Sequence, residues 1–348
     1  MRAEASAVLA CVRCEGPLDL TIADQAGDGH VMTGHLVCAR CGAMFPLERG
    51  VPRLTEGALS GDVGQTIEAF GYQWNRATAL FDARFSRAET FLDFIHPVQQ
   101  EWFVDKVVLD GGCGSGRFTL LAAGFRARLV VGIDLSSAVE VAFERSRHLE
   151  NVLIVQGDML CLPLRSVFDY AFSIGVLHHT ADPRGAFMHM VSKVVPGGGV
   201  SAWVYGAESN EWVVRVINPA RRITTHLPRP LLLVLAHIAA VPLTIVVKSI
   251  YGPVSRRPRL AWLKRRLFYF EYLAFLAQFG YREHAFIVFD HAVPAIAEYV
   301  SRGTFADWFR QAGLEHTVIT DRAGNSWRGF GLVPVSEASM RTSDTPAA

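Results

Sequence analysis

Residues 107–117, with the sequence VVLDGGCGSGR, decide the fold of this 348-residue chain. The run at 106–109 is apolar and β-branched without polar alternation, which is typical of a parallel strand buried on both faces. Closely spaced glycines follow it, and residues 118–123 continue as a helix. Glycine allows a sharp turn and lets a ligand touch the backbone, so the segment predicts a nucleotide-type site at the carboxyl end of a strand.

A second strand is expected at residues 128–134 (RLVVGID), and it ends in another acid, Asp134. A glycine-rich loop alone is weak evidence, because many α/β proteins carry one as a structural turn. An acid about twenty residues beyond such a loop can hold ribose hydroxyls, which makes the pattern far more specific.

The chain resembles the class I S-adenosylmethionine-dependent methyltransferases. Four ordered motifs carry the resemblance: DGGCGSGR at 110–117, GIDLS at 132–136, QGDMLCLP at 156–163 and FDYAFSIGVLHHT at 168–180. It covers roughly residues 107–205 and, more loosely, 304–333. The family usually has Ile, Val or Gly after an acid where Gly111 follows Asp110, a variation that leaves the assignment standing.

This resemblance implies S-adenosylmethionine as cofactor and assigns its contacts. The methionine end is expected at Asp110, Gly111, Gly112, Gly114 and Gly116, the ribose at Asp134 and Leu135, and the adenine at Asp158 and Met159, with Ile174 ending the fourth strand. The segment YQWN at 72–75 also resembles family members that cap the cofactor pocket, so Tyr72 and Trp74 are expected as pocket walls. An aromatic face can favour a sulfonium cation by roughly 0.5–2 kcal/mol.

The remaining pattern predicts an α/β fold, a Rossmann-like sheet of seven mostly parallel strands with helices on both faces. A small N-terminal zinc ribbon and an α-helical cap insertion are expected in addition. The predicted divisions are 8–54 (ribbon), 55–103 (linker and aromatic-rich helices capping the cofactor site), 104–208 (cofactor-binding core), 209–290 (insertion), 291–335 (end of the sheet) and 336–348 (disordered tail). Local predictions include helices at 81–85, 90–102 and 260–279, an N-cap at Ser136, a turn at 194–199 and a helix end before Gly313.

Two CxxC pairs stand near the N-terminus, Cys11 with Cys14 and Cys38 with Cys41, separated by 23 residues. This spacing suits a tetrahedral structural zinc that staples a segment too small for its own core. The alternatives are a redox pair and a knuckle that has lost its metal. Because Glu4 interrupts a short apolar start, no signal peptide is expected, which predicts a reducing, cytoplasmic location and free thiols.

The balanced net charge does not favour a nucleic-acid partner, and the high hydrophobicity points to segments that contact a membrane. The 34 Lys and Arg balance 33 Asp and Glu, while the hydrophobic share is 50% and the mean hydropathy +0.22. Residues 230–247 carry no charge over 18 positions, which reaches the length of a membrane span. A single crossing would separate strands of one sheet, and His237 and Pro242 weaken it further. The stretch 230–279 therefore predicts a cap over the active site, peripheral contact with a membrane, or both, since the two are compatible.

Methyl transfer is an in-line displacement that chiefly requires alignment and exclusion of water. A histidine could accept the proton of an acidic acceptor, and His178, ahead of His179, is the favoured candidate. The alternative is that these imidazoles only bond to the backbone or pack beneath the loop. Tyr205 and His291 are the expected acceptor contacts.

Three functions remain open. The favoured one is methyl transfer to the O, N or C atom of a small-molecule acceptor, with a lipophilic one suggested by the apolar insertion. The second is an RNA methyltransferase that binds its substrate through the zinc ribbon, for which the basic, aromatic patch at 256–269 is the best support. The third is a non-catalytic module that binds the cofactor.

Overall fold

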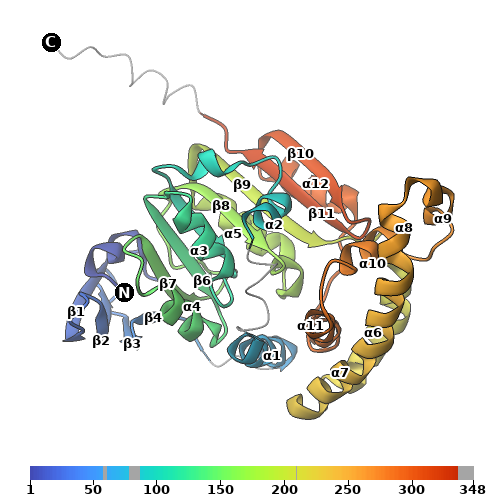
Figure 1. The fold of residues 1–348 in the computed structure, drawn as a ribbon. Coiled ribbons are helices and arrows are strands. Elements are labelled where there is room, and N and C mark those ends of the chain that lie inside the picture. The colour runs from blue at the N-terminus through green and yellow to red at the C-terminus, as the bar shows by residue number, and fades with distance from the viewer. Residues whose placement is uncertain (58–60, 78–86, 209, 336–348) are drawn as a thin grey trace.

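The computed structural model describes residues 1–57, 61–77, 87–208 and 210–335 (Figure 1). The predicted helix at 81–85 and the predicted disordered tail at 336–348 lie outside these residues. Within them the chain forms one large sheet with helices on both faces. The order of its eleven strands is β1-β2-β3-β4-β7-β6-β5-β8-β9-β11-β10. Their bounds are β1 Leu18–Gln25, β2 Val31–Cys38, β3 Met44–Glu48, β4 Val51–Leu54, β5 Val107–Gly111, β6 Leu129–Asp134, β7 Val152–Gly157, β8 Phe168–Ile174, β9 Val194–Tyr205, β10 Glu315–Arg322 and β11 Ser326–Leu332.

Seven of these strands, β7-β6-β5-β8-β9-β11-β10, form the predicted mostly parallel sheet. Neighbours from β7 to β9 pair in parallel, and β11 alone runs antiparallel to both β9 and β10. The predicted α/β, Rossmann-like fold is therefore confirmed. The loops after β5, β6, β7 and β8 all meet at one edge of the sheet, which is where ligands bind in such folds.

The N-terminal strands continue the same sheet instead of forming a separate ribbon. Strand β4 pairs in parallel with β7, with Arg53 opposite Gln156 and Leu54 opposite Gly157. Arg53 also donates a hydrogen bond to Gln156 Oε1 at 3.1 Å. The physical reason is that an edge strand leaves a row of backbone donors and acceptors open, and β4 satisfies those of β7.

Helices cover both faces, and alternate residues of β5 show this directly. Val107 and Leu109 belong to a core with α5 and α12, while Val108 belongs to another with α2, α3 and α4. Each strand of the parallel sheet is thus buried on both sides, as its unbroken apolar sequence requires. The helices are α1 Gly61–Ala77, α2 Ala88–Phe94, α3 Arg117–Gly124, α4 Ala138–Ser146, α5 Pro183–Ser192, α6 Glu211–Thr224, α7 Arg229–Val246, α8 Gly252–Arg256, α9 Ala261–Lys264, α10 Phe270–Leu276, α11 Tyr281–Ala292 and α12 Arg302–Gln311.

The insertion between β9 and β10 is helical, but its second half differs from the prediction. The expected single helix at 260–279 is wrong, because α9 and α10 are separate short helices with Tyr269 between them at φ 51°. The Tyr269 hydroxyl donates to Asn210 Oδ1. This tether to the end of β9 turns the chain where apolar periodicity alone would have continued it.

Several smaller predictions also change. The stretch 90–102 is not one helix: α2 ends at Phe94, and only a short 3₁₀ turn, Gln100–Phe103, follows. Strand β9 already begins at Val194, so the glycines at 197–199 lie within a strand whose pairing with β8 is irregular instead of ending a turn. The N-cap of α4 is Ser137 and not Ser136, but the Ser136 hydroxyl accepts from Ala138 N–H at the start of that helix at 3.2 Å while it donates to Asp134. The helix end before Gly313 is confirmed, with Gly313 at φ 67° after α12.

Candidate active site

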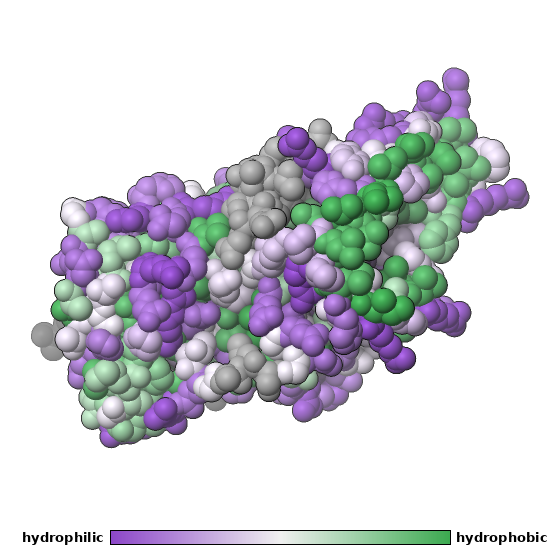
Figure 2. All heavy atoms as spheres, turned by 90° about the horizontal axis from the view of Figure 1, so that it is seen from below, coloured by the Kyte–Doolittle hydropathy of each residue, from purple (hydrophilic) through white to green (hydrophobic). Residues whose placement is uncertain are grey.

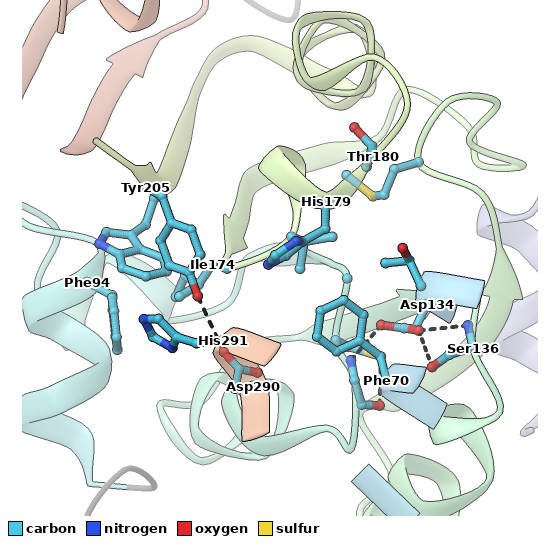
Figure 3. A pocket seen from close by; sticks show the side chains of 18 of the residues that line it. Phe70, Phe94, Asp134, Ser136, Ile174, His179, Thr180, Tyr205, Asp290 and His291 are labelled. Carbon is cyan, nitrogen blue, oxygen red and sulfur yellow. Dashed lines mark hydrogen bonds between the residues drawn. The ribbon is translucent and has the colours of Figure 1, made fainter. Parts of the chain in front are cut away.

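A cavity of about 550 Å³ opens at the carboxyl edge of the parallel strands (Figure 3). Its size falls within the roughly 300–1,000 Å³ of cofactor and small-ligand sites. One end is built by the loops after β5, β6 and β7, and the other by the ends of β8 and β9 together with α10 and α11. Helix α1 lines it as well. We call these the cofactor end and the acceptor end.

The glycine loop forms the floor of the cofactor end. The backbone N–H groups of Gly112 and Cys113 both donate to the Ile133 carbonyl oxygen, at 2.7 and 2.9 Å. Gly112 has φ 83°, and a Cβ there would lie 2.2 Å from Val176 Cγ2. Only glycine fits this position, because both the backbone conformation and the available space exclude a side chain. Gly112 and Gly114 line the cavity, while Gly111 and Gly116 are not among its lining residues.

Asp134 lies at the centre of the cofactor end. Its Oδ1 accepts hydrogen bonds from the backbone N–H and the hydroxyl of Ser136 at 2.8 and 2.6 Å, and its Oδ2 accepts from Gly114 N–H at 2.9 Å (Figure 3). Burial raises the pKa of Asp134, and these hydrogen bonds act in the opposite direction. A carboxylate has about four acceptor positions, so one stays available on the cavity side for a ribose hydroxyl.

Asp110 is in a different position from the other two predicted acids. It is fully enclosed behind the glycine loop and accepts a hydrogen bond from Thr119 Oγ1 at 2.6 Å. Burial raises the pKa of Asp110 to about 7, against the lowering effect of the Thr119 hydrogen bond. Asp110 is not a lining residue of the cavity, so it ties the loop to α3 from below.

The predicted adenine residues and their neighbours do line the cavity. Asp158 follows β7, and its Oδ1 accepts from Leu160 N–H at 2.8 Å, which fixes the loop. Leu135 and Met159 complete this wall, whereas Ile174, at the end of β8, lines the cavity near Tyr205 (Figure 3). The structure thus brings Asp134 and Asp158 to one surface, with apolar side chains for an adenine face between them.

The two histidines after β8 occupy unlike positions. His178 is fully buried, contacts the Tyr205 ring at a centroid distance of 4.0 Å, and does not line the cavity. His179 does line the cavity and donates from Nδ1 to the Ile296 carbonyl oxygen at 2.7 Å. The structure therefore brings His179, and not the favoured His178, to the cavity, and the catalytic role of either imidazole stays a prediction. Strand polarity cannot reveal this order, because the short 3₁₀ turn Leu177–His179 decides which imidazole faces outward.

Burial sets the protonation state of both imidazoles. It lowers the pKa of His179 to about 4 and holds that of His178 well below its ordinary value. The hydrogen bond to Ile296 places the His179 proton on Nδ1, so Nε2 carries a lone pair. His179 is thus a neutral hydrogen-bond acceptor at pH 7 and a weak base.

At the acceptor end, Tyr205 and His291 both line the cavity as predicted positions, and Asp290 joins them (Figure 3). Asp290 Oδ2 accepts from the Tyr205 hydroxyl at 3.3 Å, and its Oδ1 accepts from Gln73 Nε2 at 2.9 Å. His291 donates from Nδ1 to the Ile287 carbonyl oxygen at 2.9 Å. Sequence reasoning missed Asp290, although its place beside His291 in the segment DHAVP was a usable signal.

Helix α1 covers the cavity with residues other than those predicted. Its side facing the cavity carries Val63, Thr66, Ile67 and Phe70. Tyr72 is not among the lining residues and packs toward Phe289 of α11, at a centroid distance of 6.4 Å. Trp74 lies in α1, but its side chain is outside the part of the structure that is described.

Two arginines also line the cavity and were not predicted. Arg117 lies at the start of α3, and burial lowers its pKa to about 10. Arg322, at the end of β10, pairs with Asp93 at 2.6 Å and lies 3.9 Å from the Phe94 ring centroid. Only tertiary folding brings Arg322 here, because more than 200 residues separate it from the glycine loop.

The four predicted metal ligands lie together at the far end of the sheet. The Sγ atoms of Cys11, Cys14, Cys38 and Cys41 all lie within 4.8 Å of one another. The pairs Cys11–Cys41 and Cys14–Cys38 are separated by 3.7 and 3.5 Å. Tetrahedral zinc with Zn–S bonds of about 2.3 Å places its sulfurs about 3.8 Å apart, so the cluster fits one such ion.

Comparison with known proteins gives the class of this site. Residues 109–202 match a family model described as a methyltransferase domain. This stretch runs from β5 to β9 and contains the whole cofactor end except for the cover by α1. The chain carries a methyltransferase domain. The predicted enzyme class, an S-adenosylmethionine-dependent methyltransferase, is confirmed at the level of this domain.

Curated relatives of this methyltransferase domain share the name tRNA U34 carboxymethyltransferase. The protein of Pseudoalteromonas translucida is 34% identical over 114 residues, which are 32% of this chain and 35% of that protein. The protein of Glaesserella parasuis is 37% identical over 99 residues, or 27% and 31% of the two chains. The chain therefore spans about a third of the length of these relatives.

The names of these relatives correct the predicted acceptor. A small-molecule acceptor as the favoured function, and as the favoured partner, is wrong, because the matched enzymes are named for a transfer RNA. A net charge near zero is not evidence against a nucleic-acid partner. Total charge does not report how charge is distributed over the surface.

Among solved structures, a complex of the Haloferax volcanii Trm112 methyltransferase activator with a methyltransferase gives a TM-score of 0.44 at 14% identity, covering 77% of this chain and 99% of that one. An O-methyltransferase family protein of Burkholderia thailandensis gives 0.45 at 11% identity, covering 78% and 64%. The fold assignment rests on the strand order itself.

Proposed function

We propose that this methyltransferase acts on RNA, with transfer RNA as the class of acceptor. The names of the curated relatives support the acceptor class. The observation that carries the proposal is the aromatic lining of the acceptor end. The Tyr205 ring stacks near Tyr299 at 5.8 Å and near His291 at 6.1 Å, with interplanar angles of 25° and 30°.

Such a lining suits an unstacked base. Enzymes that modify a base inside a folded RNA take it out of its stack and hold it between aromatic faces. Tyr272 and Phe275 of the insertion extend the aromatic wall, and Asp290 and His179 offer hydrogen-bond acceptors to a base edge. The acceptor end therefore offers aromatic rings to the faces of a flipped pyrimidine base and hydrogen-bond acceptors to its edge.

The residues of the cofactor end fit S-adenosylmethionine. Asp134 would hold the ribose hydroxyls, Asp158 and Met159 the adenine, and the backbone of Gly112 and Gly114 the methionine part. When bound, this cofactor supplies a methyl group activated by positive sulfur. The chain then needs to orient the acceptor, exclude water and hold its departing proton. His179 Nε2 can accept a hydrogen bond from the acceptor, while Asp290 orients Tyr205.

The test is transfer of labelled methyl groups from S-adenosylmethionine to bulk transfer RNA by the full chain. We expect label in RNA, lost after ribonuclease treatment, and identified by mass spectrometry of the nucleosides. The Asp134→Ala variant serves as the inactive control. Protein that binds the cofactor by calorimetry but labels no RNA would refute the RNA proposal while leaving the cofactor assignment intact.

The four cysteines carry a second proposal, a single structural zinc. The mutual sulfur distances support it, and four thiolate ligands would leave no open coordination position for catalysis. We expect about one zinc per chain in freshly reduced protein, and loss of that zinc in the Cys38→Ser variant. Because metal binding contributes to folding free energy, chelation should increase protease cleavage within residues 8–54. Reduced protein without zinc would contradict this proposal.

A further inference from the structure

One face of the molecule is apolar and lies on the helical insertion. Among the described residues, thirteen of the eighteen exposed large apolar side chains lie between residues 212 and 270. Figure 2 shows hydrophobic side chains gathered over one half of the molecule, with hydrophilic ones around them. Soluble proteins rarely expose an apolar patch of this kind unless it contacts something.

Helix α7 has two different faces. Its inner face, with Leu232, Ala236 and Ala240, is buried and packs against α11 and α1. Its outer face forms one stripe at helical spacing, in which Ile238 and Ile245 are 62% and 60% exposed. The other members of the stripe are Leu231, Val234, Leu235, Val241 and Val246. The exposed stripe is therefore a second face of α7, separate from the face that already packs against α11 and α1.

Helical structure continues from α7 through a π-helical turn, Val247–Tyr251, and α8, giving one stretch, Arg229–Arg256, that is long and apolar enough to cross a bilayer. Only 22% of its most apolar window is buried. A single crossing is excluded by the sheet, because β9 before the helix pairs directly with β11 after it. The helix must therefore keep both of its ends on one side.

The charge of the same region is one-sided. Residues 212–270 contain eleven of the 34 Lys and Arg and none of the 33 Asp and Glu. The rest of the chain then holds 23 basic residues against 33 acidic ones. Exposed arginines stand at both ends of the apolar stripe, with Arg222 before α7, Arg256 at the end of α8 and Arg257 directly after it. This segregation favours an anionic surface as partner.

We infer that this face docks onto the surface of an anionic lipid bilayer, with α7 lying in the plane of the membrane. An aliphatic stripe bordered by arginines is the pattern of interfacial helices, whose apolar side enters the bilayer while the basic side chains meet lipid phosphates. RNA would account for the charge but not for the aliphatic stripe, because Leu, Ile and Val offer bases neither stacking nor hydrogen bonds.

The docked face lies directly behind the acceptor end of the cavity. Helix α7 packs on α11, where Thr244 and His284 side chains hydrogen-bond at 2.8 Å, and α11 carries Asp290 and His291 into the cavity. The proposal adds a location to the proposed function and does not depend on the identity of the acceptor.

The experiment is sedimentation of the full chain with vesicles of phosphatidylcholine alone and of phosphatidylcholine with phosphatidylglycerol. We expect binding to the anionic vesicles that weakens with added salt. The double variant Ile238→Ser with Ile245→Ser should lower the partition coefficient at least about tenfold, since both side chains lose apolar contact with the bilayer. The control Ile22→Ser changes an exposed isoleucine on β1 and should bind like the parent.

A triple variant, Arg256→Gln, Arg257→Gln and Arg259→Gln, should also weaken binding to anionic vesicles and leave that to neutral vesicles unchanged. The inference is overturned if the parent binds neither vesicle, or if the double isoleucine variant binds as the parent does. It is also overturned if these arginines are needed for steeply salt-dependent binding of transfer RNA while the parent protein does not bind vesicles of either composition. Label transfer to RNA is a separate readout, so failure of either proposal is distinguishable from failure of the other.

Discussion

The cofactor end and the acceptor end face the same cavity, but they are built differently. The cofactor end comes from consecutive strand ends between β5 and β8, held by backbone hydrogen bonds such as those from Gly112 and Cys113 to Ile133. The acceptor end joins the end of β9 to helices of a long insertion through side-chain contacts such as Tyr205 with Asp290. Proteins with the same strand order share the backbone geometry of such loops, whereas side-chain contacts between distant segments depend on the individual sequence.

The largest effect is expected from a substitution at the cofactor end, at Asp134. Asp134→Ala should raise the dissociation constant for S-adenosylmethionine roughly 10- to 150-fold, because the ribose would lose a hydrogen bond to a charged group, worth roughly 1.5–3 kcal/mol. Isothermal calorimetry measures the affinity, and circular dichroism checks the fold. Asp182→Ala is the matched control, since Asp182 only caps α5 through Gly185 N–H. Unchanged affinity would remove the ribose assignment.

A smaller effect is expected at the acceptor end. In the parent, the two carboxylate oxygens of Asp290 accept hydrogen bonds from Tyr205 and Gln73. Asp290→Asn keeps the size of the side chain but removes its charge and one of these two acceptor oxygens. We expect turnover in methyl transfer to fall about tenfold, as for loss of one positioning interaction, with cofactor affinity unchanged. Asp307→Asn, on the exposed side of α12, is the control. An equal loss of cofactor affinity would show that the two ends are not separable.

The smallest effect concerns pH. Since burial holds the pKa of His179 at about 4, against its ordinary value of about 6.5, protonation favours the unfolded state. The contribution of His179 to stability is complete above pH 6.5 and is lost as the pH falls toward 4. His179→Gln should therefore lose about 1 kcal/mol less unfolding free energy than the parent between pH 7 and pH 5.7, measured by urea denaturation.

The pH experiment must compare the variant with the parent, because Asp110 also changes its protonation in this pH range. The pKa of Asp110 is raised to about 7, so its burial costs stability as the pH rises from about 4 to 7, opposite to His179. The total pH dependence can then be flat even though each group contributes. An identical pH response in parent and variant would show that His179 has no depressed pKa.

Much of the core could be predicted from the sequence because its signals are local. The glycine loop, the acid at the end of β6 and the alternation of strands and helices lie within about a hundred residues, and each follows from backbone requirements. The four cysteines were predicted by spacing, and the structure brings their sulfurs together.

The acceptor end could be predicted only in part. Tyr205 and His291 were identified, but Arg322 and Phe70 reach the cavity from segments that no local pattern connects. The choice between His178 and His179 depends on one short turn, and the break at Tyr269 depends on a hydrogen bond to Asn210. Such features follow from tertiary contacts, which override propensity.

Because β4 pairs with β7, the cysteine module, residues 1–54, cannot be removed without exposing an edge of the sheet. Removing residues 1–54 would uncover the backbone donors and acceptors of β7, beside the loop that carries Asp158. A bare strand of that kind invites pairing with a second chain and aggregation. The module thus protects the flank of the catalytic sheet, whatever else it binds.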